Sequence, residues 1–289
     1  MGIMIGVQFL FAKVMQYGVL SILGGNNMKF GMPTLIEIPS LADTMKLCNE
    51  LRLDFVELNM NLPQYQIESL ENTAMLLCLA KKYNIGYTIH LDENLNVCDF
   101  NTDVANAYMN TVKQAIRIAK IINAPILNMH MNHGVHFTLP DRKVKLFEMY
   151  NDEYMRSWKQ FREMCEKEIG NDDIRICIEN TDGYTDYEKS AIEYLIERDC
   201  FYLTCDIGHL NSAKNVDEDF IMQHQDKLSH FHIHDSLGTK NHMILGTGEI
   251  DLLQRLSIAQ KYNCKCVVET KTVEALKQSV DWLSSCYGG

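Results

Sequence analysis

Four short apolar segments of this chain each end on a residue that can bind a metal ion. The segments are Ile-Cys-Ile-Glu179, Leu-Thr-Cys-Asp206, His-Phe-His232 and Cys-Val-Val-Glu269. Successive members of the set are about 26 to 37 positions apart, roughly the length of one strand–helix unit. Because parallel strands bring their C-terminal ends to one rim, the pattern predicts a shared site rather than four unrelated side chains.

The regular alternation of β-like and helix-like runs predicts a single α/β domain. From Met28 onward, eight apolar strand patterns alternate with eight amphipathic helix patterns, and no Pro-rich or Gly-rich linker separates them. A closed barrel explains the count of eight and the absence of a Gly-x-Gly-x-x-Gly turn after the first strand. We therefore predict a single-domain (β/α)8 TIM barrel over residues 28–289.

The residue patterns also give approximate element bounds. The expected strands are 29–32, 55–59, 86–91, 124–131, 174–179, 201–206, 229–234 and 265–270. Among the helices, we expect one that Ser69 caps and that runs to Lys82, one over 143–168 and one over 216–228.

The phase of each strand predicts that all four candidate ligands point into the barrel. Strand side chains alternate between two faces, so Glu179 shares a face with Cys177, and His232 shares one with His230. The opposite faces carry bulkier apolar residues such as Phe231, which suit packing against helices. Any one ligand could instead be a capped loop carboxylate or a hydrogen-bonded histidine, but the same arrangement on four strands favours a shared site.

Three carboxylates and one imidazole form a mixed oxygen and nitrogen donor set, which is typical of a site for a divalent ion. This set suits Mn²⁺, Co²⁺, Zn²⁺ or Mg²⁺ and disfavours copper(I) or an iron–sulfur cluster. Further histidines stand near the predicted rim, each with a hydrogen-bonded structural role as the alternative to a role in the site. They are His90, His130, His209 and His242.

The composition argues against nucleic acid as a partner. The chain has 27 basic and 38 acidic residues and a net charge of −11, whereas a large nucleic-acid footprint needs clustered Lys and Arg. Most of the ten cysteines lie inside apolar segments, and no Cys-x-x-Cys pair occurs. We therefore expect reduced, structural cysteines and a cytoplasmic location.

Residues 1–27 do not continue the strand–helix alternation. They are apolar but interrupted by Lys13, Gln16 and Tyr17, and neither apolar stretch reaches the ~20 residues that a membrane span needs. We expect an N-terminal extension outside the fold. A packed N-terminal helix and a signal or anchor segment are the alternatives.

In combination, the residues at the strand ends resemble one known family. They are Ile-Glu179-Asn, Asp206-x-x-His209, His232-x-x-Asp235, His242-x-x-x-Gly246-x-Gly248 and Val-Glu269-Thr. This set resembles the xylose-isomerase-like TIM-barrel superfamily, which includes sugar and sugar-phosphate isomerases and epimerases and also endonuclease IV. The resemblance implies that Glu179, Asp206, His232 and Glu269 hold one divalent ion, which binds two substrate oxygens and stabilises an enediolate.

The resemblance also implies catalytic and substrate-binding roles. Glu179 and Glu269 would move protons on and off a substrate carbon, and His209 would hold a substrate hydroxyl. The remaining rim residues would contact substrate or orient their neighbours; these are His90, His130 and His242.

Two departures from the endonuclease pattern favour sugar chemistry. Lys240 stands two residues before His242, where endonuclease IV has an acidic ligand, and the loop after His90 lacks the aromatic residue of the DNA enzymes. We expect Lys240 to point into the site and bind a substrate hydroxyl, carboxylate or phosphate. The alternative is that Lys240 extends into solvent.

The expected function is therefore the isomerisation or epimerisation of a small sugar or sugar phosphate with one divalent ion. An endonuclease IV-like phosphodiesterase acting on abasic DNA is the second candidate, and a binding protein without catalysis is the third. The expected partner is a small-molecule substrate, without nucleic acid or membrane, and a homo-oligomer is left open.

Overall fold

Eight parallel strands form a closed barrel, which confirms the predicted single-domain (β/α)8 fold. The computed structural model describes residues 28–287. Around the barrel the strand order is β1-β12-β9-β8-β7-β4-β3-β2, and β2 pairs with β1 to close the ring. The bounds are β1 Lys29–Pro33, β2 Phe55–Asn59, β3 Gly86–His90, β4 Ile126–His130, β7 Arg175–Glu179, β8 Phe201–Asp206, β9 Leu228–Ile233 and β12 Lys265–Val268.

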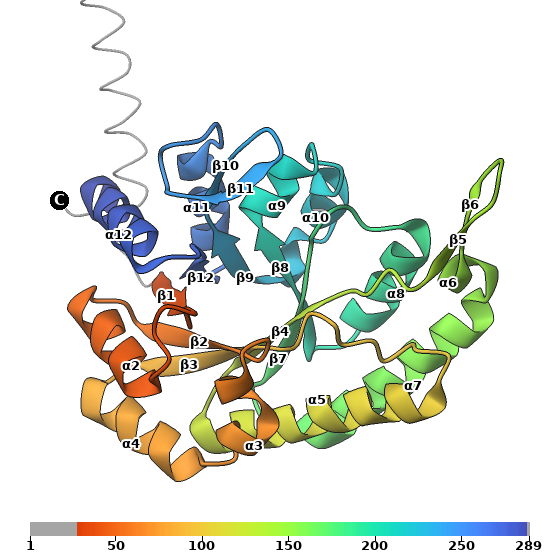
Figure 1. Ribbon diagram of the computed structural model, residues 1–289, viewed down its shortest axis with the longest axis horizontal. Helices are drawn as coiled ribbons and strands as arrows, with labels where there is room; N and C mark the ends of the chain where they lie inside the picture. The colour runs from red at the N-terminus through yellow and green to blue at the C-terminus, as the bar shows by residue number, and fades with distance from the viewer. Residues whose placement is uncertain (1–27, 288–289) are drawn as a thin grey trace, which may run out of the picture.

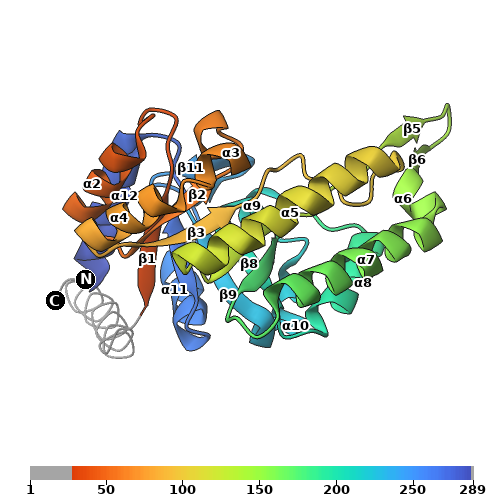
Figure 2. The same cartoon turned by 90° about the horizontal axis from the view of Figure 1, so that it is seen from below.

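Helices follow the strands and lie around the outside of the barrel (Figures 1 and 2). Several begin at residues whose side chains accept a backbone N–H of the first turn, such as Ser40 before α2 and Asp206 before α9. The longer helices are α2 Leu41–Glu50, α4 Thr73–Tyr83, α5 Thr102–Ile122, α7 Asn151–Ile169, α8 Asp186–Ile196, α11 Leu252–Lys261 and α12 Val273–Tyr287. The shorter ones are α3 Ile67–Leu70, α6 Leu146–Met149, α9 Ile207–Ser212, α10 Glu218–Gln223 and the 3₁₀ turns Pro63–Tyr65 and Gln225–Lys227.

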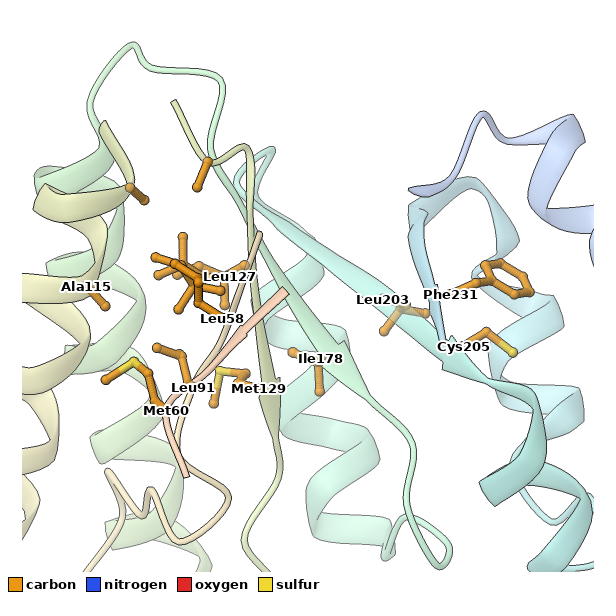
Figure 3. Close-up of a cluster of buried hydrophobic side chains, with 14 of the residues drawn as sticks. Leu58, Met60, Leu91, Ala115, Leu127, Met129, Ile178, Leu203, Cys205 and Phe231 are labelled. Atoms are coloured by element: carbon orange, nitrogen blue, oxygen red, sulfur yellow. The ribbon is translucent and has the colours of Figure 1, made fainter. Parts of the chain in front are cut away.

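The outward faces of the strands supply the apolar core between barrel and helices. Figure 3 shows Leu58 of β2 and Leu127 of β4 on the side of the barrel where Ala115 of α5 lies, and all three are fully buried. Phe231 and Cys205 occupy the equivalent face of β9 and β8, where they adjoin residues of α10 and α11. The predicted apolar outer face of the strands is therefore confirmed.

The inner faces carry buried polar side chains that contact one another across the barrel. Strand β2 does not pair with β9, yet Glu57 lies 2.9 Å from His230, so the contact crosses the interior. Each of these side chains makes at least one hydrogen bond, as buried polar side chains usually do. The residues of this inner layer are Glu57, Thr88, Asn128, Thr204 and His230.

Three of the expected helices differ from the structure. Asn72, rather than Ser69, caps the helix that ends at Tyr83, because residues 67–70 form the separate short helix α3. The expected helix over 143–168 starts at 151, with α6 before it. Residues Lys143–Lys145 instead form β6, which pairs antiparallel with β5 (His136–Thr138). The expected helix over 216–228 is replaced by α10 and a 3₁₀ turn.

The predicted extension over residues 1–27 lies outside the described residues. Within residues 28–287, no helix combines the length and apolar character needed to cross a membrane.

A chain that starts at Met28 is predicted to unfold at the same temperature as the full chain, because every strand pair that closes the barrel uses residues from Lys29 onward. Thermal unfolding followed by circular dichroism measures this. A fall of several degrees corresponds to a loss of about 1–2 kcal/mol for a domain of this size. Such a fall would show that residues 1–27 pack against the barrel.

Candidate metal centre

The barrel brings the four predicted ligands together at the C-terminal ends of the strands. Glu179 ends β7, Asp206 ends β8, His232 lies near the end of β9, and Glu269 directly follows β12. One donor atom from each lies within 4.8 Å of the others. All four residues are buried, with Glu269 the most accessible at 9%.

The three carboxylates converge on one nitrogen, Nδ1 of His232. It lies 3.1 Å from Glu179 Oε1, 3.2 Å from Glu269 Oε2 and 3.9 Å from Asp206 Oδ2. Three oxygens and one imidazole nitrogen of this kind are a donor set for a divalent ion such as Mn²⁺, Co²⁺, Zn²⁺ or Mg²⁺.

Buried polar atoms without hydrogen-bond partners also favour a metal ion at this position. Among the described residues they include Glu269 Oε2 and Nδ1 of His209, both of which face the carboxylate cluster. A buried polar group left without a partner is costly and calls for an explanation. A cation bound among the carboxylates would satisfy Glu269 Oε2, so the residues fit the ion that their chemistry implies.

The neighbouring charges keep Glu179 and Glu269 ionised despite their burial. Burial alone would raise the pKa of the Glu179 carboxyl, but the imidazoles of His232 and His130 outweigh it and hold that pKa well below its ordinary value. Glu269 is in the same position: burial raises its pKa, and His232 lowers it further than burial raises it. The cluster is therefore a concentrated negative charge in the barrel mouth, which attracts cations.

All four rim histidines predicted from the sequence lie beside these carboxylates. Nε2 of His130 and Nε2 of His90 lie 3.1 Å and 3.4 Å from the same oxygen, Glu179 Oε2. His209 Nδ1 lies 3.4 Å from Asp206 Oδ2, and His242 Nε2 lies 3.6 Å from Glu269 Oε1. The structure thus assembles the predicted set, while contact of its members with a substrate stays a prediction.

The lysine that contacts the cluster is one that the sequence reasoning did not select. Lys271 Nζ lies 2.9 Å from Glu269 Oε1. Lys240 is exposed at the start of β11 (Lys240–Met243), which forms a hairpin with β10 (Asp235–Leu237). The substrate contact proposed for Lys240 stays a prediction. The sequence offered one indication of this contact, because Lys271 lies two residues after Glu269 in the loop that follows β12.

Asn128 is a second residue that sequence reasoning missed. Its amide nitrogen donates a hydrogen bond to Glu179 Oε2, and its carbonyl oxygen accepts one from Thr204 Oγ1 at 2.5 Å. Its position two residues before His130, on the same face of β4, could have indicated this role. The amide fixes the orientation of the Glu179 carboxylate.

His234 orients Asp206 from the other side. The backbone N–H of His242 donates to His234 Nδ1 at 2.8 Å, which leaves the ring proton on Nε2. His234 Nε2 lies 3.1 Å from Asp206 Oδ2 and donates its proton to that oxygen. Ring and helix approach closely because residue 208 is glycine: a Cβ there would lie 1.9 Å from the His234 ring.

The Asp235 and Gly-x-Gly elements of the sequence pattern have a structural explanation. The Asp235 carboxylate accepts backbone N–H groups from Gly246 at 3.0 Å and Gly248 at 2.8 Å. Gly246 has a φ of +80°, and a Cβ on Gly248 would lie 2.2 Å from the Ser236 carbonyl oxygen. These contacts hold the loop that follows His242 against the hairpin.

Gly208→Ala is predicted to lower the free energy of unfolding by about 1–3 kcal/mol, because the added methyl group overlaps the His234 ring and must displace it from Asp206. Thermal unfolding of the metal-free protein measures the loss. Gly86→Ala is the matched control, since a Cβ there meets only Phe55 at 3.9 Å. Equal melting temperatures for the two variants would contradict the packing described here.

Comparison with known proteins identifies the family. Residues 40–286 match the family model described as xylose isomerase-like TIM barrel, so the chain belongs to that family. The uncharacterised protein MJ1614 of Methanocaldococcus jannaschii is 26% identical over 273 residues, which cover 90% of this chain and 96% of the relative.

Solved structures share the fold at low sequence identity. A D-tagatose 3-epimerase-like protein superposes with a TM-score of 0.72 at 22% identity, covering 90% of this chain and 97% of its own. The IOLI protein, whose structure contains a zinc atom, superposes with a TM-score of 0.69 at 15% identity, covering 90% and 98%. At these identities the likeness establishes the architecture alone.

Proposed function

We propose that this protein is a divalent-metal-dependent isomerase or epimerase of a small sugar or sugar phosphate. The observation that carries the proposal is the convergence of Glu179, Asp206 and Glu269 oxygens on His232 Nδ1 at the mouth of the barrel. Membership of the xylose isomerase-like family and the shared fold with a D-tagatose 3-epimerase-like protein support it.

In the barrel order, the two glutamates lie on either side of the other two candidate ligands. Strands β8 and β9 lie between β7 and β12, so Glu179 and Glu269 flank Asp206 and His232. When bound, the ion would polarise two neighbouring substrate oxygens and stabilise negative charge that develops on them. A substrate held above Asp206 and His232 would then have one carboxylate on either side of its reacting carbon.

The surroundings of the two glutamates differ, and the difference bears on their roles. Glu179 Oε2 accepts a hydrogen bond from the Asn128 amide and lies near two imidazoles. These contacts make it a weak proton acceptor. Glu269 Oε1 faces His242 and Lys271, and Lys271 is largely exposed and has a flexible stem. We assign the first proton abstraction to Glu269, since Lys271 can move aside at little cost.

The polar rim suits a small hydroxylated substrate. A pocket beside Glu269 is lined by Asn59, Asn61 and Lys271 together with Leu35 and other apolar residues. The imidazoles around the carboxylates add donors and acceptors for hydroxyl groups.

Metal-replete protein is predicted to exchange the proton next to the carbonyl of a ketose with solvent and to form its epimer or isomer. Glu179→Gln and Glu269→Gln should each lower the rate by about 10²–10⁴-fold, because each removes a proton-transfer group. Both should also strip bound metal, since the ion loses charge and geometry. Proton NMR in D₂O over a panel of sugars, with elemental analysis, measures both effects.

Glu274→Gln is the matched control, because Glu274 is exposed on α12 and should leave metal content and rate unchanged. Full metal and full activity in both Glu179→Gln and Glu269→Gln would refute the assignment. Metal-dependent incision of an abasic duplex, lost in Glu179→Gln, would instead support the endonuclease IV-like candidate.

A further inference from the structure

A buried carboxylate lies beneath the metal centre and contacts its histidine. Glu57 of β2 is 1% exposed and accepts three hydrogen bonds inside the barrel. Its Oε1 accepts from His232 Nε2 at 2.8 Å, and its Oε2 accepts from His230 Nε2 at 2.9 Å and from Thr88 Oγ1 at 2.8 Å. Neither the sequence pattern nor the assigned ligand set includes this residue.

The chemistry of these bonds decides which His232 nitrogen faces the cluster. An ionised carboxylate only accepts hydrogen bonds, so His232 Nε2 must carry a proton. Nδ1 is then the one ring nitrogen whose lone pair can be offered to a cation. Glu179 Oε1 and Glu269 Oε2 lie 3.1 Å and 3.2 Å from this same nitrogen.

We infer that Glu57 is a positioning residue of the metal centre, which selects the Nε2-protonated form of His232 and fixes its ring so that Nδ1 binds the ion. Glu57 itself is not a ligand, because its two oxygens accept the hydrogen bonds of Thr88, His230 and His232. Partners of this kind also make a ligating imidazole a stronger donor. The inference rests on the proposed function, since it assumes that an ion binds to His232.

His230 shares the Glu57 carboxylate with His232. His230 and His232 meet edge to face, with ring centroids 5.1 Å apart, and both direct Nε2 to Glu57. His230 Nδ1 is buried and has no hydrogen-bond partner. A Gln at position 57 has one acceptor oxygen for three donors, and with that oxygen toward His230 and Thr88 its NH₂ group faces His232 Nε2 and disfavours a proton there. Glu57→Gln removes the negative charge and keeps the shape.

Glu57→Gln is predicted to bind Zn²⁺ or Mn²⁺ about 10- to 100-fold more weakly than the unaltered chain. Titration of the metal-free protein against a competing chelator measures this without any assay of turnover. Thr88→Val is the matched control: it removes the third donor to the same carboxylate but no contact with His232. Its metal affinity should change by less than about threefold, well below the range expected for a lost partner of a ligand.

A second measurement uses the unaltered chain and does not depend on how a variant folds. Two-dimensional NMR of ¹⁵N-histidine-labelled, Zn²⁺-loaded protein should show His232 protonated at Nε2 and metal-bound at Nδ1. Metal bound at Nε2 would overturn the inference. So would a Glu57→Gln affinity loss below about threefold, or one no larger than that of Thr88→Val. If the unaltered chain binds neither Zn²⁺ nor Mn²⁺, the proposed function fails together with this inference; a normal wild-type affinity with an unaffected Glu57→Gln refutes the inference alone.

Discussion

The repulsion between three buried carboxylates is the constraint on which the rest of this structure depends. Glu179, Asp206 and Glu269 come so close that their ligand atoms lie within 4.8 Å of one another. Removing such charges from water costs several kcal/mol each unless opposite charge and hydrogen bonds offset it. The imidazoles, Asn128 and Lys271 around them supply the compensation that side chains can give.

The compensating groups belong to two polar layers that are stacked along the barrel axis. The upper layer holds the four candidate ligands and the rim histidines, and the lower layer holds Glu57, Thr88, Asn128 and His230. The lower layer fixes the orientation of the upper one, because His232 and Glu179 each receive a hydrogen-bond partner from below. A third support comes from the side, where His234 donates to Asp206. Preorganisation of this kind is what a metal site needs to bind tightly with few ligands.

The sequence predicted the barrel and the converging ligands because both depend on simple periodicity. A strand period of two placed Glu179 and His232 on inner faces, and the regular βα alternation brought their strand ends to one rim. Glu57 could not be located in this way, because nothing near it in Phe-Val-Glu-Leu-Asn indicates a partner; the fold brings His230 and His232 to it across the barrel. Pairings between residues more than 170 positions apart are set by tertiary structure, which local patterns do not encode.

The sequence also did not predict the contacts that loops make or the residues at which some helices begin. Lys271 reaches Glu269 through the conformation of a turn, and residues 143–145 form a strand because they pair with 136–138 rather than continuing into α7. Propensity alone favours helix in that segment, and the hairpin overrides it.

The most direct test of the account is the position of a bound ion. Crystals grown with Mn²⁺ or Zn²⁺ should give one strong anomalous peak in the barrel mouth, coordinated by His232 Nδ1 and by oxygens of Glu179, Asp206 and Glu269. The absence of a peak there, or a principal peak among His209, His234 and His242, would contradict it.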